Sequence, residues 1–357
     1  MKSKVYFIRV LNSDSVNNVA DKLRRLLKVS DALGFIRKGE KAVLKMHFGE
    51  DGNVGFVRPE YVRLVCEAVR KKDAECVLLD TNTLYRGRRT NSRDHLELAR
   101  EHGFTLDNVG AQVLIPDETQ IDNVVEVEIN GKFIKKAKIL KIFKEADAIV
   151  DIAHFKGHIM TGFGGVLKNI GMGCATREGK LTQHSDVSPI VYKDNCGGCG
   201  ACEEVCPVKA ITIKDKKSQI DAKVCIGCAS CIAACKYHAI DVNWEAGGSS
   251  IQEKMVEYAG AVLKGKKKKV ACINFALKIT KECDCLAKDD PRIAADTGIF
   301  ISSDPVSADK AALDMVNQLS GKDVFKEAHP KRDGMKQLVY AQELGLGNLD
   351  YELIEVS

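Results

Sequence analysis

The chain has 357 residues, 45% of them hydrophobic and 29% charged, and its formal net charge is +5. These proportions are typical of a globular protein with one large or two medium domains, and no apolar run is long enough to span a bilayer. The first ten residues are too short and too polar for a signal peptide. We therefore expect a cytoplasmic protein that binds neither nucleic acid nor membrane.

Predicted strands and helices alternate through the first part of the chain. Apolar runs at "KVYFIRV", "KAVLKMHF" and "ECVLLDTN" predict buried strands, and residues 58–72 predict a helix with a proline near its start. "DHLELAREHGF" predicts a helix that stops at a glycine, and "VVEVEINGKFIKKAKI" predicts a hairpin with Asn130-Gly131 at its turn. "ADAIVDIAHF" is typical of a further buried strand.

Two copies of one cysteine pattern follow in the middle of the chain. The sequence reads "CGGCGACEEVCPVKAITI" from Cys196 and "CIGCASCIAACKYHAIDV" from Cys225, so C-x2-C-x2-C-x3-C occurs twice, each time before a short β-branched strand. Zinc ribbons, the alternative, have paired C-x2-C knuckles that lie far apart. The repeat closely resembles the bacterial two-cluster ferredoxins, in which the fourth cysteine of each run ligates the other run's cluster.

By that resemblance, the eight cysteines form two ligand sets. One 4Fe–4S cluster is expected on Cys196, Cys199, Cys202 and Cys235, and the other on Cys225, Cys228, Cys231 and Cys206. The runs differ after the fourth cysteine, where Pro207 stands in the first and Lys236 in the second. A cation there favours the reduced, more negative state of its cluster, so we expect the two reduction potentials to differ.

The α/β pattern returns after the repeat. "QEKMVEYAGAVLKG" and "DPVSADKAALDMVNQL" predict helices, "VACINFAL" and "TGIFISS" predict strands, and the basic block "KGKKKK" predicts a solvated turn. Strands that alternate with helices indicate an α/β fold with a mostly parallel sheet and helices on both faces. We therefore predict one discontinuous α/β domain, residues 1–190 and 244–357, interrupted by a ferredoxin-like α+β domain at residues 191–243.

Candidate catalytic side chains lie at or just after the predicted strand ends, where such sheets bind ligands. The stretch "HFKGHIMTGFGGVLKNIGMGC", residues 154–174, joins histidines, lysines and glycines directly after a predicted strand. Its glycines leave backbone N–H groups exposed where a helix begins, which suits a small anion, and its lysines add charge-assisted hydrogen bonds. A purely structural glycine turn is the alternative. The candidates are His154, His158, Lys156, Lys168 and, at an earlier strand end, His47.

Six cysteines lie outside the repeat. Three of them, in predicted core positions, are Cys66, Cys76 and Cys272. The other three are expected to bind a third metal centre, because "ECDC" places Cys283 and Cys285 where both sulfurs can reach one metal and Cys174 adds a third thiolate. Three thiolates leave one iron of a cluster, or one position of a zinc ion, open to substrate. Three unrelated thiols, or a redox-active Cys283/Cys285 pair, are the alternatives.

Several motifs together resemble one family over nearly the whole chain. They are "MHFGEDGNVGFVRPEYV", "LLDTNTLYRG", "HFKGHIMTGFGGVLKNIGMGCATREGK", "ECDCL" and "SSDPVSADKAALDMV", with the ferredoxin-like repeat between the third and the fourth. This combination is similar to the iron–sulfur branch of the family called domain of unknown function 362. The resemblance implies an α/β fold and a cluster-bearing redox role, and it implies no particular reaction.

The leading hypothesis is an iron–sulfur oxidoreductase that exchanges electrons with a redox partner protein through two 4Fe–4S clusters. The electrons pass to a site in the α/β domain that binds a small anionic substrate, at a third, open metal centre of iron–sulfur or zinc type. A non-catalytic ferredoxin-type electron-transfer subunit and a sulfur or cluster transfer protein are the alternatives.

Overall fold

A sheet of eight strands forms the centre of the larger part of the molecule. The computed structural model describes residues 2–84, 87–184, 188–225, 227, 229–242, 250–266 and 268–357. Within these residues only β15 runs against the other strands of this sheet, so the predicted α/β class with a mostly parallel sheet is confirmed. The order across the sheet is β16 (Tyr351–Glu355), β1 (Ser3–Arg9), β15 (Gly298–Ser302), β14 (Val270–Ala276), β7 (Ala148–His154), β2 (Lys41–Lys45), β3 (Glu75–Leu79) and β4 (Gln112–Leu114).

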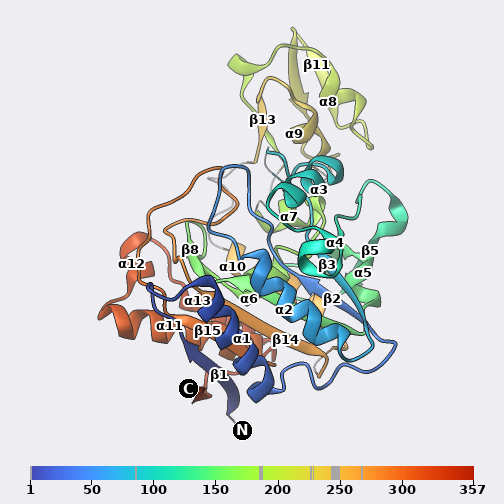
Figure 1. The fold of residues 1–357 in the computed structure, drawn as a ribbon. Helices are drawn as coiled ribbons and strands as arrows, with labels where there is room; N and C mark the ends of the chain where they lie inside the picture. Colours follow the sequence, from blue (N-terminus) through green and yellow to red (C-terminus); the bar gives the residue numbers. More distant parts are fainter. Residues whose placement is uncertain are drawn as a thin grey trace.

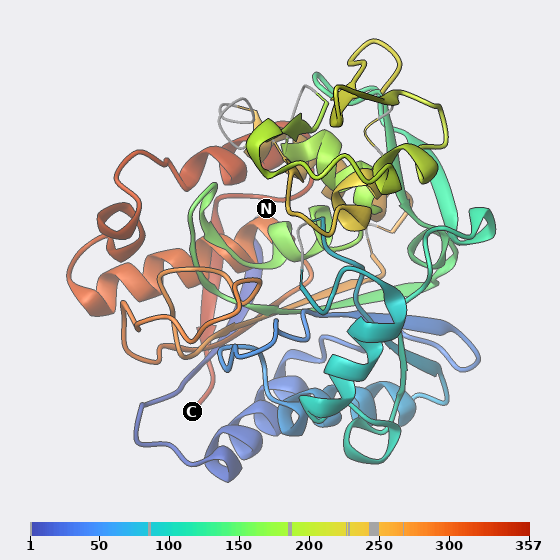
Figure 2. The same cartoon turned by 90° about the horizontal axis from the view of Figure 1, so that it is seen from above.

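Helices cover both faces of this sheet, because side chains alternate along each buried strand. In β7, Ile149 and Ala153 point into one core, whereas Val150 and Ile152 point into the other. Figure 2 shows the sheet between the two helical layers. The first layer holds α1 (Val16–Ser30), α2 (Pro59–Arg70), α3 (Ser92–Glu101) and α4 (Leu106–Val109). The second holds α6 (Val166–Gly171), α10 (Ile251–Leu263), α11 (Pro305–Ser320), α12 (Val324–Ala328) and α13 (Met335–Glu343).

The helix boundaries follow local sequence. Pro59 and Pro305 occupy the first helical positions of α2 and α11, where the missing N–H costs nothing. Asp304 accepts from two backbone N–H groups of the first turn of α11, and Gly321 ends that helix in the left-handed conformation. These starts and stops were predictable because they depend on residues that are neighbours in the chain.

The predicted hairpin is formed by β5 (Val124–Glu128) and β6 (Lys136–Leu140), and Asn130 and Gly131 lie in its turn, which is longer than two residues. The paired residues end at Glu128 and Lys136, and the loop between them runs from 129 to 135. The carboxylate of Glu257, on α10, accepts from the backbone N–H groups of Phe133 and Ile134 and holds this longer loop. A partner distant in sequence therefore decides the turn.

The remaining elements of the larger part are short. The glycine-rich stretch after β7 forms a small hairpin of β8 (Lys156–His158) and β9 (Gly162–Gly164), and α6 follows it. The others are η1 (Ile121–Asn123), α5 (Lys141–Glu145) and α7 (Arg177–His184).

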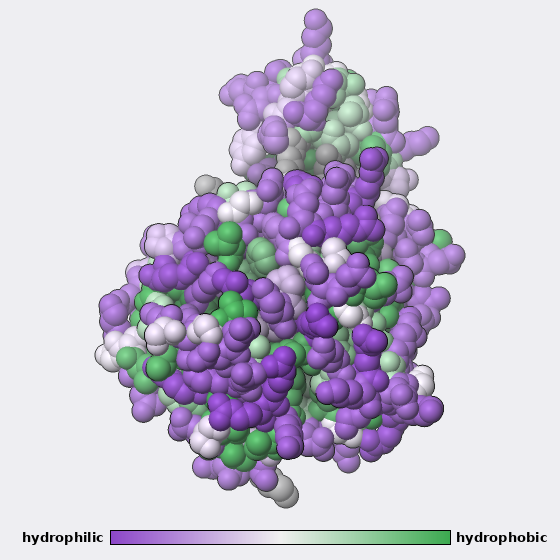
Figure 3. All heavy atoms as spheres, in the orientation of Figure 1, coloured by the Kyte–Doolittle hydropathy of each residue, from purple (hydrophilic) through white to green (hydrophobic). Residues whose placement is uncertain are grey.

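The cysteine repeat folds into a separate segment that projects from the larger part (Figures 1 and 3). It begins and ends where β10 (Ile190–Val191) pairs with β13 (Ile240–Asp241). Between them lie η2 (Lys193–Asn195), α8 (Ala201–Glu204), the hairpin of β11 (Ile211–Lys214) and β12 (Lys217–Ile220), and α9 (Ser230–Ala234). The domain boundaries at 191 and 243 remain a prediction; residues 243–249 lie outside the described part of the chain.

The backbone of this segment repeats with the sequence. Three pairs of residues, each 29 positions apart, share a positive φ: Gly198 with Gly227, Gly200 with Ala229, and Lys209 with His238. Two further residues with positive φ, Asp215 and Lys216, form the tight turn between β11 and β12. The two cysteine runs are therefore structural copies of each other.

The segment packs on the larger part through a small core of its own. Leu84 and Leu181 of the larger part join this core, in which Cys202, Cys231 and Ile240 are buried. Of the helices that the structure describes, none has the length and apolar composition to cross a membrane.

Candidate redox site

The cysteines of the first predicted ligand set line one small hollow. Cys196, Cys199 and Cys202 come from the first run and Cys235 from the second, and all four surround this hollow together with Ile213 and Ile240. The four cysteines that the ferredoxin resemblance groups together thus lie around one hollow, and their role as cluster ligands remains a prediction. Four sulfurs around an apolar hollow suit a 4Fe–4S cube.

Backbone N–H groups point at the sulfurs of both runs. Ala210 donates to Cys206 Sγ at 3.2 Å, and Ala239 donates to Cys235 Sγ at 3.3 Å, which are equivalent contacts in the two runs. Hydrogen bonds of this kind stabilise thiolates and tune the potential of a cluster that they hold. In the second predicted ligand set, Cys206, Cys225 and Cys231 are described, whereas Cys228 lies outside the described residues.

A cavity of about 460 Å³ lies between the ferredoxin-like segment and the carboxyl edge of the sheet. Its wall includes the last residue of β2, Lys45, and residues that follow the ends of β3 and β7, as predicted for strand ends in an α/β fold. The segment contributes Asp241, which directly follows Ile240 in β13. Two consecutive residues therefore face the hollow of the first cysteine set and this cavity.

The wall of the cavity is strongly cationic. Its basic side chains are Lys45, Arg89, Lys156, Lys168 and Lys180, and its acidic ones are Asp80 and Asp241. Its imidazoles are His47, His158 and His184. Carboxylates outside or beside the wall pair with Lys45, Arg89 and Lys156, but basic side chains still outnumber acidic ones on the wall itself, which favours small anions there.

Fixed partners hold several of these cations in place. Lys45 contacts the Asp80 carboxylate at 2.9 Å and donates to Asn169 Oδ1 at 2.9 Å. Arg89 pairs with Glu50 at 3.1 Å and lies 2.8 Å from His47 Nε2. Lys45 and Arg89 are therefore positioned before any ligand arrives.

Burial changes the protonation of the groups around the cavity. It lowers the pKa of Lys180 to about 8, with Glu118 and Asp80 opposing the shift. Burial, followed by the charge of Arg89, holds the pKa of His47 well below its usual range. Burial and the charge of Lys168 do the same for the pKa of His158. Both imidazoles are therefore neutral near pH 7, and Lys180 can exchange a proton there.

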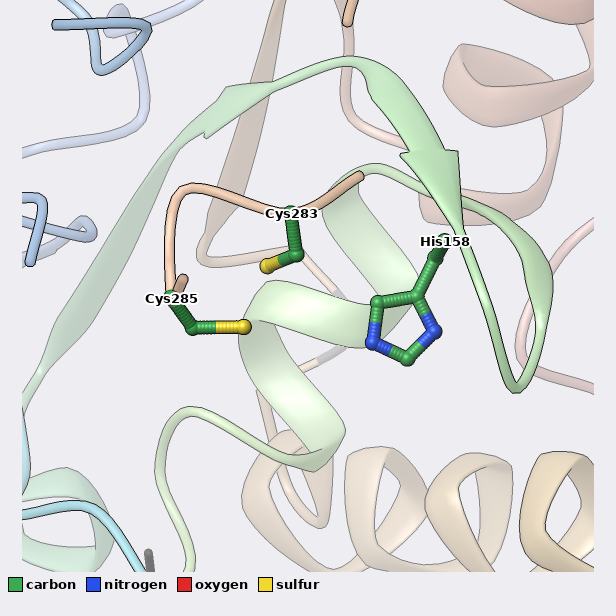
Figure 4. A group of neighbouring side chains, drawn as sticks. All are labelled: His158, Cys283 and Cys285. Carbon is green, nitrogen blue, oxygen red and sulfur yellow. The ribbon is translucent and has the colours of Figure 1, made fainter. Parts of the chain in front are cut away.

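The C-x-C sequence reaches this cavity on the loop after β14. Cys283 is buried, Cys285 lines the cavity, and their sulfurs lie with a ring nitrogen of His158 within 4.8 Å of one another. Figure 4 shows the two sulfurs approaching each other, with His158 facing them from β8. Lys168 Nζ lies 3.5 Å from Cys283 Sγ.

The two sulfurs are not equivalent. A hydrogen bond from Cys285, followed by the charges of Lys168 and Lys156, places the pKa of Cys283 well below its usual value against the effect of burial. The same hydrogen bond, together with burial, places the pKa of Cys285 well above its usual value. The hydrogen bond between the two sulfurs and the nearby lysines therefore favour negative charge on Cys283 rather than on Cys285.

Two contacts of Gly157 hold the β8–β9 hairpin against the C-x-C loop. A side chain at Gly157 would overlap the carbonyl oxygen of Lys281, so only glycine lets the β8–β9 hairpin approach the C-x-C loop this closely. The Gly157 N–H donates to the Thr280 carbonyl at 2.9 Å and ties the two segments. The alternative of a structural role for the glycines therefore holds at this position.

The expected anion site at the start of α6 is already filled by the protein. The backbone N–H groups of Val166 and Leu167 donate to the carboxylate of Asp309, at 2.7 and 2.9 Å. Burial raises the pKa of this carboxyl to about 6, although Asn274 and these N–H groups oppose it. The prediction that the glycine-rich loop presents free N–H groups to a substrate was wrong, because α11 supplies the anion.

His154 does not face the cavity. Side chains alternate along β7, so His154 points to the face opposite Ala153. Its Nδ1 lies 2.8 Å from the Asp284 carboxylate, and its Nε2 lies 2.8 Å from the Leu277 carbonyl. Burial would raise the pKa of Asp284, but His154 and Lys156 hold it well below its usual range. His154 therefore positions the C-x-C loop through the residue between its two cysteines.

The other four candidates, His47, Lys156, His158 and Lys168, line the cavity.

Cys174 is not part of the C-x-C group. It is fully buried after α6, and its backbone carbonyl accepts from Leu140. Burial, with the nearby Asp151 and Asp80 carboxylates, raises the pKa of its thiol. The structure brings His158, rather than Cys174, to Cys283 and Cys285.

Sequence reasoning missed three cations of the cavity, Lys45, Arg89 and Lys180. Lys45 gave a usable signal, since it is a charged residue within the apolar strand "KAVLKMHF". Arg89 and Lys180 lie in stretches rich in polar residues, where one more basic residue gives no signal of burial.

The cysteine-lined hollow and the repeated fold define a ferredoxin-like segment, which is carried by an α/β domain. The chain belongs to the family described as domain of unknown function, DUF362, whose model matches residues 42–314. A short segment of the chain is similar to curated iron–sulfur proteins. It is 38% identical over 53 residues to one component of an ion-translocating oxidoreductase complex of Methanosarcina acetivorans, which is 15% of this chain and 20% of that protein.

Two further relatives match over 54 residues each. An uncharacterized ferredoxin of Methanocaldococcus jannaschii is 47% identical, over 15% of this chain and 30% of its own length. The iron–sulfur cluster-binding subunit of a menaquinone reductase of Nitratidesulfovibrio vulgaris is 46% identical, over 14% and 21%. The chain thus spans about a fifth to a third of the length of these relatives.

Two solved structures are similar at low identity. A Thermotoga maritima protein matches at 14% identity and a TM-score of 0.43, over 84% of this chain and 59% of that one. The lactate racemase apoprotein of Thermoanaerobacterium thermosaccharolyticum matches at 15% identity and a TM-score of 0.36, over 76% and 50%.

Proposed function

We propose that this protein is an iron–sulfur oxidoreductase that passes electrons through two 4Fe–4S clusters to a small anionic substrate bound in the cationic cavity. The observation that carries the proposal is the pair Ile240 and Asp241, which face the first cysteine hollow and the cavity from adjacent positions. A cluster and a bound substrate would then be separated by little more than one strand. Short separation favours electron transfer.

The cluster ligands in this proposal are the two crossed sets of cysteines. Bound clusters would supply one-electron transfer at low potential. The chain keeps the first set in apolar surroundings through Ile213 and Ile240, and its N–H groups stabilise the thiolate charge. Exposed Cys199 lies at the surface of the segment, which suits electron exchange with a partner protein.

The substrate class follows from the wall of the cavity. Lys156 and Lys168 offer charge to carboxylate, phosphate or oxyanion groups, and Lys45 and Arg89 fix the field behind them. Lys180, with its pKa of about 8, is the best placed proton donor for a reduced product.

A third metal centre at the C-x-C sequence belongs to the same proposal. We place the reaction in the cytoplasm, where free thiols and clusters persist.

A non-catalytic electron-transfer subunit is the second candidate, favoured by the short segment shared with subunits of redox complexes. Such a subunit needs a docking surface, whereas burying several cations around a cavity costs free energy that docking does not require. A sulfur transfer protein would use Cys283, whose sulfur lies 3.5 Å from Lys168 Nζ.

Anaerobic protein with both clusters tests the proposal. The melting temperature is measured with pyruvate, oxalate, nitrite, sulfite and phosphate, and any anion that stabilises the chain is mixed with the dithionite-reduced protein. We expect at least one anion to stabilise the protein and to reoxidise its clusters. Lys168→Met should weaken its binding at least tenfold, whereas Lys216→Met, on the exposed β11–β12 turn, should not. Clusters that exchange electrons with a carrier while no anion binds would support the electron-transfer subunit instead.

A further inference from the structure

We infer that Cys283, Cys285 and His158 bind a single divalent metal ion of the zinc type, with an open coordination position that faces the cationic cavity. The role of this ion in substrate binding rests on the proposed function; its binding does not. The three residues come from the loop after β14 and from β8, and Cys174 is not among them.

The spacing of the donor atoms suits one ion. Zinc bonds to thiolate sulfur at about 2.3 Å and to imidazole nitrogen at about 2.0–2.1 Å, so its tetrahedral ligands lie roughly 3.5–4 Å from one another. The two sulfurs and the nitrogen lie within 4.8 Å of one another, close to this separation. A four-iron cube holds its thiolates around a larger body, and this group is too compact for it.

The donor set points to a borderline-soft ion. Two thiolates and one imidazole bind zinc strongly, and carboxylate-preferring ions such as Mg²⁺ are disfavoured. Two thiolate charges balance a divalent ion, and Lys168, 3.5 Å from Cys283 Sγ, can donate to the bound sulfur. Three protein ligands leave a fourth position, as in catalytic zinc sites. Cys285 and His158 line the cavity, so that position opens toward it.

The residues behind the ligands are arranged to orient them. In Figure 4 one ring nitrogen of His158 faces the sulfurs and the other faces the β8–β9 turn. Nδ1 lies 3.0 Å from Thr161 Oγ1, which donates its own proton to the Phe163 carbonyl at 2.7 Å and can therefore accept from Nδ1–H. Ligating histidines in metal sites use such an acceptor.

The metal-free ring has a second arrangement available. The backbone N–H groups of Met160 and Thr161 lie 3.2 Å from His158 Nδ1 and favour a proton on Nε2, which then points at the sulfurs. When a metal ion binds Nε2, the ring carries its one proton on Nδ1 instead, and Nδ1–H donates a hydrogen bond to Thr161 Oγ1. Thr161 is thus a positioning residue for the site, and its hydroxyl is needed only when the metal is bound.

The test uses full-length, anaerobic protein with both clusters loaded, equilibrated with Zn²⁺ and desalted without any substrate. We expect one zinc per chain by mass spectrometry. Absorption fine structure at the zinc edge, which iron does not disturb, should show two sulfurs at about 2.3 Å and a nitrogen at about 2.0–2.1 Å. Cys283→Ala, Cys285→Ala and His158→Asn should each lower the zinc content at least tenfold. Cys174→Ala, which removes a buried thiol outside the group, should leave it unchanged.

Variants of Thr161 distinguish a true metal site from three side chains that are merely close together. Thr161→Val should weaken zinc binding roughly 10- to 100-fold, the range known for such partners, and Thr161→Ser should restore it. A zinc shell of four sulfurs, which would place the ion in vacant ferredoxin cysteines, overturns the inference. So does full zinc retention in the Cys283→Ala/Cys285→Ala double variant, or no zinc in protein that retains its cluster signals. Because no substrate is present, loss of zinc binding alone leaves the anion test above standing, and failure of the anion test leaves the zinc site standing.

Discussion

The ferredoxin-like segment and the α/β domain assemble their functional side chains differently. In the segment, the cysteines of one hollow come from two short copies of a motif, and their backbone geometry repeats at a spacing of 29 residues. In the α/β domain, the cavity joins Lys45, Lys156, Lys180 and Cys285, which lie far apart in the chain. The first site is encoded locally, and the second exists only because strand ends converge.

The two regions also differ in what stabilises them. The core of the segment is small and includes its own cysteines, so the proposed clusters would contribute much of its stability. The α/β domain has two extensive apolar cores, one on each face of the sheet. This surplus lets it bury charges beside the cavity. The comparison therefore predicts that loss of a cluster unfolds the ferredoxin-like segment, whereas loss of a buried charge lowers the stability of the α/β domain.

The largest expected effect is on the segment. Cys199→Ser should remove one low-potential cluster signal in electron paramagnetic resonance and half of the cluster iron, because the first set loses a ligand. The α/β domain should keep its unfolding transition. Cys76→Ser, outside both sets, is the matched control. Collapse of both regions in the Cys199 variant would show that they do not fold separately.

The next effect tests the buried charges. Lys45→Met should lower the free energy of unfolding of the α/β domain by about 3–5 kcal/mol, because it leaves the Asp80 carboxylate buried without its nearest cation. Urea unfolding followed by circular dichroism measures it. Lys41→Met, in the same strand but paired with Glu75 at the surface, should change stability by less than about 1 kcal/mol. Equal effects of the two changes would contradict the prediction.

A smaller effect concerns pH. Burial lowers the pKa of His95 to about 4, although Asp80 opposes this shift, while the unfolded chain protonates it near 6.5. Between these values the unfolded state binds the extra proton, so stability falls as the pH falls from 6.5 toward 4. From pH 7 to pH 5, wild type should lose roughly 2 kcal/mol more than His95→Gln. Parallel pH profiles with intact cluster absorbance would rule this out.

The smallest expected effect distinguishes the two clusters. Lys236 is exposed and lies over the ring of Tyr237 next to Cys235. Lys236→Pro should lower the potential of the nearer cluster, because a cation that favours the reduced state is removed, and the other cluster should hardly move. Solvent screening keeps the shift small. If voltammetry shows both reduction potentials unchanged, Lys236 is not the cause of a difference between the two clusters.

The sequence by itself determined the features that depend on neighbouring residues. The cysteine spacing predicted the repeated fold, and apolar periodicity with capping residues predicted the strands and most helix boundaries. The same patterns indicated the α/β class and the family, and they placed His47 and Lys156 near strand ends. Each of these inferences needs only residues within a few turns or one strand of each other.

Only the tertiary structure decided which side chains meet. Asp284 and the Leu277 carbonyl bind the ring of His154 away from the cavity, and Asp309 of α11 occupies the N–H groups that the glycine-rich loop offered. Because β8 packs against the C-x-C loop, the neighbour of Cys283 is His158, whereas the sequence had predicted Cys174. These outcomes depend on packing between elements more than a hundred residues apart, and pairwise spacing in one sequence carries no information about such contacts.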